Sequence, residues 1–313
     1  MNASLPADSP PVAIILVNWN GWQDTSECLA SLQKLNYPNF KIFVVDNGST
    51  DNSAARVRER RFGRVEVIET GGNLGFAGGN NAGLRKALAG NFQYFWLLNN
   101  DTTVDPDALR YLVRRLREKP EAGICGSTIL YYDRPAVIWA QGGRFNRWYA
   151  EGRHIGINKK FDPNKLSAYQ KLERKLDYVV GASMLVSRPF LQDIGLMEEG
   201  YFIFFEEMDW SRRARRRYSL AYAPASLVYH KVGSSIERKA GDKPQRYNLV
   251  ADQYGTRNRL KFTLKYFPYA LPVLYLSVLG YIIDRAVHGA WANIGVIAQE
   301  FRAHLANLFT GRR

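Results

Sequence analysis

Acidic and amide side chains follow several apolar runs of this chain, and their types and spacing suit metal and phosphate chemistry. The clearest case is YFWLLNNDTTVDP (94–106), in which an apolar run ends on Asn-Asn-Asp at 99–101. A carboxylate is rarely placed at the mouth of a buried strand without something to bind. A hard cation such as Mg²⁺ or Mn²⁺ takes oxygen ligands, needs one or two carboxylates and can bridge two phosphates. Asp101 is therefore a candidate metal ligand, unless it only caps the next helix, a role that Asp105 suits better.

A second acidic group lies in FEEMDWSRRAR (205–215), where Glu206, Glu207 and Asp209 follow an apolar run. Carboxylates this close raise one another's pKa, which suits a general base. Acidic residues also favour the first turn of a helix, so the group could serve only that purpose. Both interpretations can hold, because one carboxylate can cap the helix while another does chemistry.

Two further features are weak evidence when taken alone. His230 ends the apolar run SLVYH, but a lone histidine at a strand end is more often structural than a ligand. The stretch GGNLGFAGGNN (71–81) has neither Walker A nor GxGxxG spacing. Its glycines and small amides would let backbone N–H groups approach a phosphate or ribose, although an ordinary strand-to-helix turn has the same composition.

Strands that alternate with helices must position these residues. The expected buried strands are 12–17, 41–46, 65–69 and 94–98. Helices are expected from Asp24, where Asp24 and Glu27 resemble a capping box, from Ser53 and from Leu84. This order predicts an α/β fold with a mostly parallel sheet flanked by helices, whose ligands bind beyond the carboxyl ends of the strands. The polar residues expected at that edge are Asn18 to Asn20, Asp46, Asn73 to Asn81, and Asn99 to Asp101.

After residue 120, predicted strands no longer alternate regularly with predicted helices. GICGSTILYY (123–132) predicts another strand, and IWAQGGRFNRW (138–148) predicts a glycine-turned hairpin. YFIFF (201–205) reads as an apolar strand that leads into a charged helix.

The amino-acid composition limits the classes of partner that this chain is expected to bind. Lys and Arg number 43 against 29 Asp and Glu, so the formal net charge of the 313-residue chain is +14. Such a surplus indicates a nucleotide, a nucleic acid or an anionic membrane, unless it only aids solubility. We expect no nucleic acid, because no recognisable module or interleaved aromatic surface is present. Cys28 and Cys125 are expected as core residues, which suits a reducing compartment, and the first residues do not resemble a secretory signal.

Taken in order, the motifs resemble those of family-2 glycosyltransferases with the GT-A fold, particularly the bacterial rhamnosyltransferase-like branch. The matching stretches are VNWNG (17–21), VVDNGSTD (44–51), GGNLGFAGGNNAG (71–83), LLNND (97–101), GAS (181–183), FEEMDWSRRAR (205–215) and YH (229–230). They span roughly residues 12 to 260. Each motif is weak alone, but the ordered series is specific.

The resemblance implies a role for each matching residue. Trp19 falls where the family places an aromatic ring against the nucleobase, and Asp46 where a carboxylate hydrogen-bonds the base. The residues implied to bind the donor are Asn18, Trp19, Asn20, Asp46, Asn73, Gly75, Asn80, Asn100 and Asp101.

The same resemblance assigns the chemistry. Asp101 and His230 would hold a divalent metal, Mg²⁺ or Mn²⁺. Glu207 would be the general base, with Glu206 and Asp209 around the acceptor, and direct displacement would invert the anomeric configuration. The chain departs from the family pattern in three ways. It has Asn-Asn-Asp where Asp-x-Asp is common, an Asn in the glycine loop where Arg is common, and Glu rather than Asp as the base.

The implied function is an inverting, metal-dependent glycosyltransferase that moves rhamnose from dTDP-rhamnose to a lipid-linked or cell-surface saccharide. Transfer from UDP-galactofuranose or another UDP-hexose is the alternative. An alternative from another functional class is a non-catalytic subunit that binds nucleotide-sugars. The evidence for it is that the Asn-Asn-Asp motif has fewer acidic residues than Asp-x-Asp.

The predicted organisation has three parts. Residues 1–11 form a flexible N-terminus, and residues 12–260 form the GT-A domain, with a nucleotide-sugar-binding half (12–120) and an acceptor half (121–260). The C-terminal part, 261–313, contains FPYALPVLYLSVLGYIID (267–284), which is short for a span of about 20 apolar residues. We expect amphipathic helices at the anionic inner face of the cell membrane, near a polyprenyl-diphosphate-linked acceptor. A helical pack on the catalytic domain and a homodimer interface stay open as alternatives.

Overall fold

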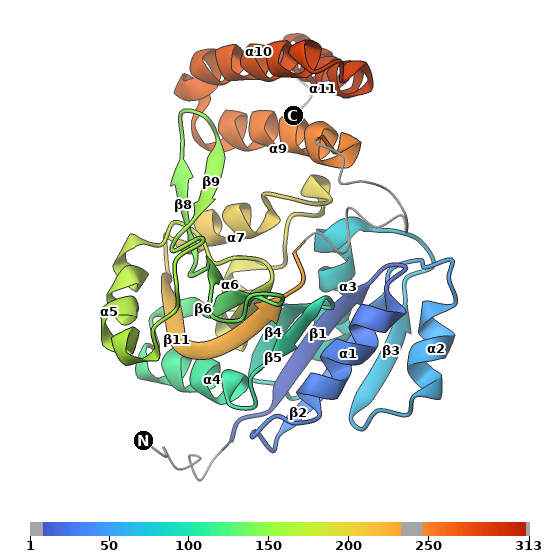
Figure 1. Ribbon diagram of the computed structural model, residues 1–313, viewed down its shortest axis with the longest axis vertical. Coiled ribbons are helices and arrows are strands. Elements are labelled where there is room, and N and C mark those ends of the chain that lie inside the picture. The colour runs from blue at the N-terminus through green and yellow to red at the C-terminus, as the bar shows by residue number, and fades with distance from the viewer. Residues whose placement is uncertain (1–8, 233–246, 311–313) are drawn as a thin grey trace. The chain divides into compact units, whose positions relative to one another are not determined.

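The structure is a computed structural model that describes residues 9–232 and 247–310. Within these residues the chain forms two compact units (Figure 1). The first unit contains the chain up to Arg144, His154–Gly200, and the segment from Glu206. The second contains Phe145–Arg153, Tyr201–Phe205 and the C-terminal helices.

A mixed β-sheet forms the centre of the first unit. Its strand order is β3-β2-β1-β4-β10-β6-β11-β5, and β7 pairs with β6. The strands are β1 (Val12–Asn18), β2 (Phe40–Asp46), β3 (Val65–Glu69), β4 (Tyr94–Asn99), β5 (Thr102–Val104), β6 (Ala122–Tyr131), β7 (Ile138–Ala140), β10 (Ser183–Ser187) and β11 (Ser219–His230). β1 to β4 are parallel, as expected, but β10 runs antiparallel between β4 and β6. The α/β fold is thus confirmed, with the all-parallel part confined to the first half.

Helices cover both faces of this sheet (Figure 1). They are α1 (Trp22–Leu32), α2 (Ser53–Glu59), α3 (Gly75–Leu88), α4 (Ala108–Glu118), α5 (Leu166–Gln170), α6 (Arg188–Ile194) and α7 (Glu206–Ala214), with 3-10 turns at Pro163–Lys165, Lys171–Lys175 and Glu199–Tyr201. Side chains of β1 alternate between the faces. Val12 and Ile14 pack on the α1 and α4 side, whereas Ile15 packs on the α3 and α7 side. Burying each such side chain stabilises the fold by about 1.5–3 kcal/mol.

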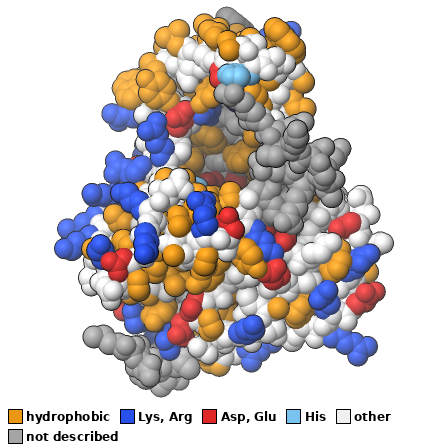
Figure 2. Space-filling model, in the orientation of Figure 1, with side chains coloured by type: hydrophobic (Ala, Val, Ile, Leu, Met, Phe, Trp, Pro, Cys, Tyr) orange, Lys and Arg blue, Asp and Glu red, His pale blue; other side chains and the backbone are white. Residues whose placement is uncertain are grey.

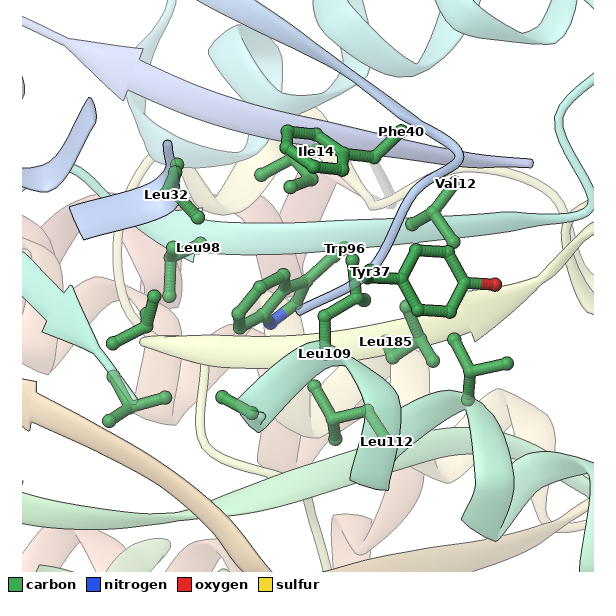
Figure 3. Close-up of a cluster of buried hydrophobic side chains, with 14 of the residues drawn as sticks. Val12, Ile14, Leu32, Tyr37, Phe40, Trp96, Leu98, Leu109, Leu112 and Leu185 are labelled. Carbon is green, nitrogen blue, oxygen red and sulfur yellow. The ribbon is translucent and has the colours of Figure 1, made fainter. Parts of the chain in front are cut away.

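Figure 3 shows the first of these two layers, in which Trp96 of β4 lies among leucines of α1 and α4. Trp96 is fully buried, and its indole Nε1–H donates to Ser183 Oγ at 3.0 Å. The strand that carries the Asn-Asn-Asp motif is therefore fixed by packing on one side and by a satisfied polar group at its centre.

Four local predictions were wrong. Helix α1 begins at Trp22 without a side-chain cap, because Asp24 and Glu27 instead form ion pairs with Lys231. Helix α3 begins at Gly75, so most of the predicted glycine loop is helical. The predicted hairpin at 138–148 is absent, since the chain turns at Gly142 (φ 90°), β7 pairs with β6, and β8 pairs elsewhere.

The fourth error concerns residues 201–205, where Tyr201 ends a 3-10 turn and the residues after it form an irregular loop rather than a strand. Three phenylalanines, Phe202, Phe204 and Phe205, have φ angles of 64°, 67° and 75°. An extended strand requires negative φ at every residue, so this segment cannot join the sheet.

The second unit contains three helices and a hairpin tip. The helices are α9 (Leu249–Tyr266), α10 (Leu271–Val287) and α11 (Trp291–Thr310), with a 3-10 turn at Pro268–Ala270. The hairpin pairs β8 (Gly143–Asn146) with β9 (Glu151–His154). A domain boundary after residue 260 would fall inside α9. By length and composition alone, Pro268–Val287 is long enough to cross a membrane, contrary to the expectation that it is too short.

Candidate active site

A chain of hydrogen bonds joins the carboxyl ends of β1, β2 and β4. Asn100 Nδ2 donates to Thr25 Oγ1 at 2.9 Å, and the Thr25 hydroxyl donates to Asn18 Oδ1 at 2.7 Å. Asn18 Nδ2 then donates to Asp46 Oδ1 at 2.9 Å. Thr25, Asn18 and Asp46 are almost fully buried. Three of the predicted donor residues therefore meet, and the link between them is a threonine of α1 that the sequence motifs did not indicate.

The turn after β2 fixes the Asp46 carboxylate further. Its Oδ2 accepts the Ser49 backbone N–H at 3.1 Å, and Ser49 Oγ accepts from Asn18 Nδ2 and from the Asn20 backbone N–H. Asn20 accepts the Thr50 backbone N–H in turn. Trp19, between Asn18 and Asn20, keeps half of its surface exposed. A rigid carboxylate beside an exposed indole is an arrangement suited to holding a planar base.

The predicted glycine-loop residues form the start of α3. Asn73 Oδ1 accepts the Gly75 backbone N–H at 2.9 Å and the Asn47 amide at 3.1 Å. Asn47 also donates to the Gly75 carbonyl, so it ties the end of β2 to the start of α3. Asn80 lies further along α3, where its amide donates to the Phe76 carbonyl. Asn73 and Gly75 thus lie next to the end of β2, whereas the Asn80 amide is bonded to its own helix.

Pairing of β5 with β11 brings Asp101 to His230. In the antiparallel register His230 lies opposite Thr102, and the Lys231 backbone N–H donates to the Asp101 carbonyl at 3.0 Å. His230 Nε2 lies 3.2 Å from Asp101 Oδ1, and both side chains are buried. His230 Nδ1 has no hydrogen-bond partner among the residues that the structure describes.

One carboxylate and one imidazole that face each other fit a hard divalent cation. Mg²⁺ and Mn²⁺ commonly take one or two protein ligands and complete their shell with phosphate oxygens and water. In the described part of the chain, no three His, Cys, Asp or Glu side chains cluster as a closed metal site. Asp101 and His230 would supply two of the ligands of such a cation.

The Trp139 ring packs between two histidine rings, one of which is His230. The Trp139 ring centroid lies 4.6 Å from that of His230 and 4.4 Å from that of His154. Burial, and after it the proximity of His230, lowers the pKa of His154 to about 4. His154 is therefore neutral at physiological pH and adds no charge beside the Asp101–His230 pair.

Glu206 and Glu207 begin α7 as a pair of neighbouring carboxyl groups, of which Glu206 is buried and Glu207 partly buried. Burial first, and then the charge of Glu207, raises the pKa of Glu206 well above its usual range. Burial raises the pKa of Glu207 to about 7, although backbone N–H groups of the first helical turn oppose this shift. One oxygen of each carboxyl, Oε2, is buried without a partner among the described residues. Because its pKa lies near neutral pH, Glu207 can gain or lose its proton there.

An apolar cluster links the acidic pair to the histidine. It consists of Ile129, Ala140, Tyr178, Val180 and Ala182, with Trp139 and Met208 packed against it. Met208 follows Glu207 in the chain, and Trp139 packs on His230. Ala182 also accepts the Asn99 backbone N–H at 3.1 Å, immediately before Asn100 and Asp101. The base candidate, the histidine and the Asn-Asn-Asp motif therefore surround one small core.

Asp209 does not share this environment. It is fully buried, and its Oδ2 lies 2.8 Å from Arg213 Nε, one turn further along α7. Arg213 also donates to the carbonyls of Ile194 and Leu196 beyond α6. The carboxylate thus helps to fix the α6–α7 corner, and the role of Asp209 around the acceptor stays a prediction.

Sequence reasoning missed several residues that build the site. Asn47 and Ser49 lie within the quoted motif VVDNGSTD, so the sequence could have indicated them, but we did not single them out. Thr25 was harder to predict from the sequence, because a buried threonine in a helix is weak evidence for a binding site. Trp139 had no signal, because its contact with His230 spans 91 positions of the chain.

Solved structures with this fold define the class of protein. A mannosyltransferase, PcManGT from Pyrobaculum calidifontis, in complex with GDP-Man and Mn²⁺, matches with a TM-score of 0.58 at 17% identity, over 99% of this chain and 81% of that chain. TarS 1–349 of S. aureus matches with a TM-score of 0.54 at 13% identity, over 96% and 92%. The fold is that of GT-A glycosyltransferases, as predicted.

The sequence then defines the family. The family described as glycosyl transferase family 2 matches residues 13–195, which is more than half of the chain. The chain belongs to this family and is a glycosyltransferase.

Curated relatives agree with the predicted branch. An N-acetylglucosaminyl-diphospho-decaprenol L-rhamnosyltransferase of Mycobacterium tuberculosis (strain ATCC 25618 / H37Rv) is 24% identical over 274 residues, 80% of this chain and 88% of the relative. The low-salt glycan biosynthesis hexosyltransferase Agl10 of Haloferax volcanii is 27% identical over 214 residues, 66% of this chain and 62% of the relative. The prediction of a rhamnosyltransferase-like family-2 enzyme is confirmed.

Proposed function

We propose that the protein is an inverting, metal-dependent glycosyltransferase whose general base is Glu207. The observation that carries the proposal is the Glu206–Glu207 pair, buried at Glu206 and partly buried at Glu207, in which burial raises the pKa of Glu207 to about 7. A general base is most effective when its pKa lies near the working pH. The same apolar cluster borders this pair and the Trp139 ring that packs on His230.

Each residue then has a definite task. Glu207 accepts the proton of the acceptor hydroxyl as that oxygen attacks the anomeric carbon, and attack opposite the leaving group inverts the configuration. Burial and the charge of Glu207 raise the pKa of Glu206 and favour its protonated form, which can donate a hydrogen bond to a sugar hydroxyl. Trp19 stacks on the nucleobase, and Asp46, held by Asn18, accepts a hydrogen bond from it.

Asn20, Asn73, Gly75, Asn80 and Asn100 complete the proposed donor side. Asn100 and Asn73 orient their neighbours through the hydrogen bonds described above, and Asn80 supports α3 from within. Asp101 and His230 would hold Mg²⁺ or Mn²⁺, which as a Lewis acid stabilises the charge that develops on the leaving diphosphate.

For the donor we propose dTDP-rhamnose. The support is the M. tuberculosis relative, whose name specifies L-rhamnosyl transfer, at 24% identity over most of both chains. UDP-galactofuranose or another UDP-hexose is the alternative, because identity at this level does not carry sugar specificity. A non-catalytic nucleotide-sugar-binding subunit is disfavoured by the intact acidic pair.

A thermal-shift panel tests the donor directly. It compares dTDP-rhamnose, UDP-galactose, UDP-galactofuranose, UDP-GlcNAc and GDP-mannose, each with and without Mn²⁺. A bound ligand raises the melting temperature by mass action. We expect the largest metal-dependent shift with dTDP-rhamnose. A larger shift with a UDP-sugar would move the assignment to that donor, and no shift with any member would contradict an active enzyme.

We further propose that the second unit docks on the anionic inner face of the cell membrane, where a polyprenyl-diphosphate-linked acceptor would lie. Figure 2 shows apolar side chains gathered over α10 and α11. On α10, Leu276, Leu279, Ile283 and Val287 are half to three-quarters exposed and recur at helical spacing. Such a face is far more apolar than water-exposed helices usually are.

Aromatic and basic residues complete the proposed membrane face. Trp148 at the hairpin tip contacts Tyr269 at 5.6 Å between ring centroids, and both are exposed, as interfacial aromatic residues are. Lys265, near the end of α9, adds positive charge that an anionic leaflet attracts.

We favour docking in the plane of the membrane over spanning it. The opposite side of α10 packs on its neighbours, because Arg285 pairs with Asp252 of α9 at 2.8 Å and Tyr275 contacts Phe301 of α11. A spanning α10 would have to leave these partners and carry the Arg285 charge toward lipid. A homodimer that buries the same face is the competing occupant, and the vesicle test in the Discussion separates the two.

A further inference from the structure

We propose that Asn258 of α9 is a positioning residue for the catalytic base. It holds the loop at 201–205, and the residue that follows this loop is Glu206, the first residue of α7. The inference rests on the proposed role of Glu207, and the experiment below separates failure of one from failure of the other.

The loop has a conformation that its own residues disfavour. Phe202, Phe204 and Phe205 have φ angles of 64°, 67° and 75°. Left-handed backbone is costly for a residue with a Cβ, and aromatic side chains seldom adopt it. Three such residues within four positions persist only when surrounding groups over-determine the conformation.

Asn258 supplies those surrounding groups. Its Nδ2 donates to the backbone carbonyls of Tyr201, Ile203 and Phe204 at 2.8, 2.7 and 3.0 Å. Asn258 is fully buried, so water cannot replace the bonds if the amide is removed. The two N–H groups of this amide are thus shared among three loop carbonyls, and the Tyr201 carbonyl also accepts the Ile203 backbone N–H at 2.7 Å.

The rest of the same helix face packs on the loop. The Tyr254 ring stacks on Phe202 at 4.8 Å and 14°, and Phe262 lies 5.5 Å from Phe205. Residues 254, 258 and 262 are four positions apart and therefore share one face of α9. The amide lies at the middle of this face, between two ring contacts, so α9 selects the loop conformation as a whole.

The consequence for catalysis follows from chain connectivity. The loop sets the direction in which the backbone enters α7, and Glu207 lies two residues beyond Phe205. Without the Asn258 amide, we expect the phenylalanines to relax toward negative φ, which rotates the first turn of α7. A misplacement of about 1 Å can cost about 100-fold in rate even when the altered residue is remote from the chemistry.

The test compares Asn258→Ala with Thr263→Val in the full-length protein. Thr263 is a matched control, because it lies on the same helix, is equally buried, and has a hydroxyl without a partner among the described residues. We expect Asn258→Ala to lower kcat about 10- to 100-fold and to leave the Kd of dTDP and UDP, measured by calorimetry, within two-fold. Thr263→Val should change neither quantity.

A second readout is independent of turnover. Hydrogen–deuterium exchange should rise in Asn258→Ala over the loop and the first turn of α7, and stay at the wild-type level in β1 and β4. Phe204→Gly, introduced into Asn258→Ala, should recover part of kcat, since glycine adopts φ near 67° without strain. If Asn258→Ala does not fold, Asn258→Ser, which leaves a smaller cavity, takes its place.

Two results would overturn the inference. One is wild-type kcat in Asn258→Ala, and the other is a fall in kcat with an equal loss of nucleotide binding and faster exchange throughout the first unit. The latter would mean that Asn258 supports stability alone. Retained turnover in Glu207→Gln would instead refute the proposed base, whatever Asn258→Ala does.

Discussion

Replacing Glu207 by Gln should abolish sugar transfer and, at the same time, stabilise the protein. The carboxyl has a pKa of 4.5 when exposed and about 7 in the fold. A carboxyl with a raised pKa favours folding below pH 4.5, and this contribution is lost as the pH rises through 7. At 1.36 kcal/mol per pKa unit, ionised Glu207 costs the fold about 3 kcal/mol at pH 8 and less than about 1 kcal/mol at pH 5. Gln cannot ionise, so Glu207→Gln avoids this cost.

Two assays check both halves of the prediction. We expect the melting temperature of Glu207→Gln to exceed that of the wild type by about 5 °C at pH 8 and by about 1–2 °C at pH 5. Nucleoside diphosphate release should fall at least about 1,000-fold, while the Kd for the nucleotide stays unchanged. Glu206→Gln is the matched control, because burial raises the pKa of Glu206 and so favours the neutral form that Gln imitates. We expect this variant to retain most of the wild-type turnover. A melting-temperature difference that is equal at both pH values would refute the burial argument, and full turnover in Glu207→Gln would refute the base.

The remaining predictions address the metal, the donor edge and the membrane. Asp101→Asn and His230→Ala should each lose the Mn²⁺-dependent rise in melting temperature seen with a nucleotide; an unchanged rise would remove both from the metal site. Thr25→Val should leave Asn100 and Asn18 with unsatisfied polar atoms, which lowers the free energy of unfolding by about 1–3 kcal/mol. It should also weaken nucleotide binding roughly 10-fold, as measured by calorimetry. Wild-type affinity would mean that the hydrogen-bonded chain has no part in binding. Leu276→Asp should abolish co-flotation with vesicles that contain anionic lipid and leave soluble-acceptor turnover intact. Wild-type flotation would contradict membrane docking, as would a dimer in solution that this substitution dissociates.

Local sequence signals predicted the first half of the fold well. Strands such as VAIILV and KIFVVD are apolar, β-branched and closely spaced with helices, so neither long-range contacts nor loop geometry was needed to recognise them. Their carboxyl ends carry Asn18 and Asp46, and parallel pairing brings these to one edge without further information. The position of a site residue was predictable wherever it follows from the rule that the carboxyl ends of parallel strands lie at one edge of the sheet.

Composition misled where backbone geometry decides the structure. GFAGGNN is rich in glycine and therefore looked like a loop, yet Gly79 and Gly83 lie in α3, where a Cβ would come within 2.7 Å of β1 side chains. These glycines allow close helix–sheet packing and do not bend the chain. YFIFF looked like a strand because its side chains are apolar, but its φ angles come from contacts with α9 that no local pattern encodes.

The residues that complete the site come from distant parts of the chain. Asp101 and His230 are 129 positions apart in sequence and meet only because β11 returns antiparallel to the short strand β5. Trp139, the neighbour of His230, and Met208, the neighbour of Glu207, pack on one cluster although they lie on different elements, β7 and α7. Such contacts are set by the register of strands that pair late in the chain, and a shift of one residue would turn His230 to the other face of the sheet. The motifs therefore predict which residues do the chemistry, whereas the packing of Trp139, Met208 and Asn258 depends on contacts between distant parts of the chain.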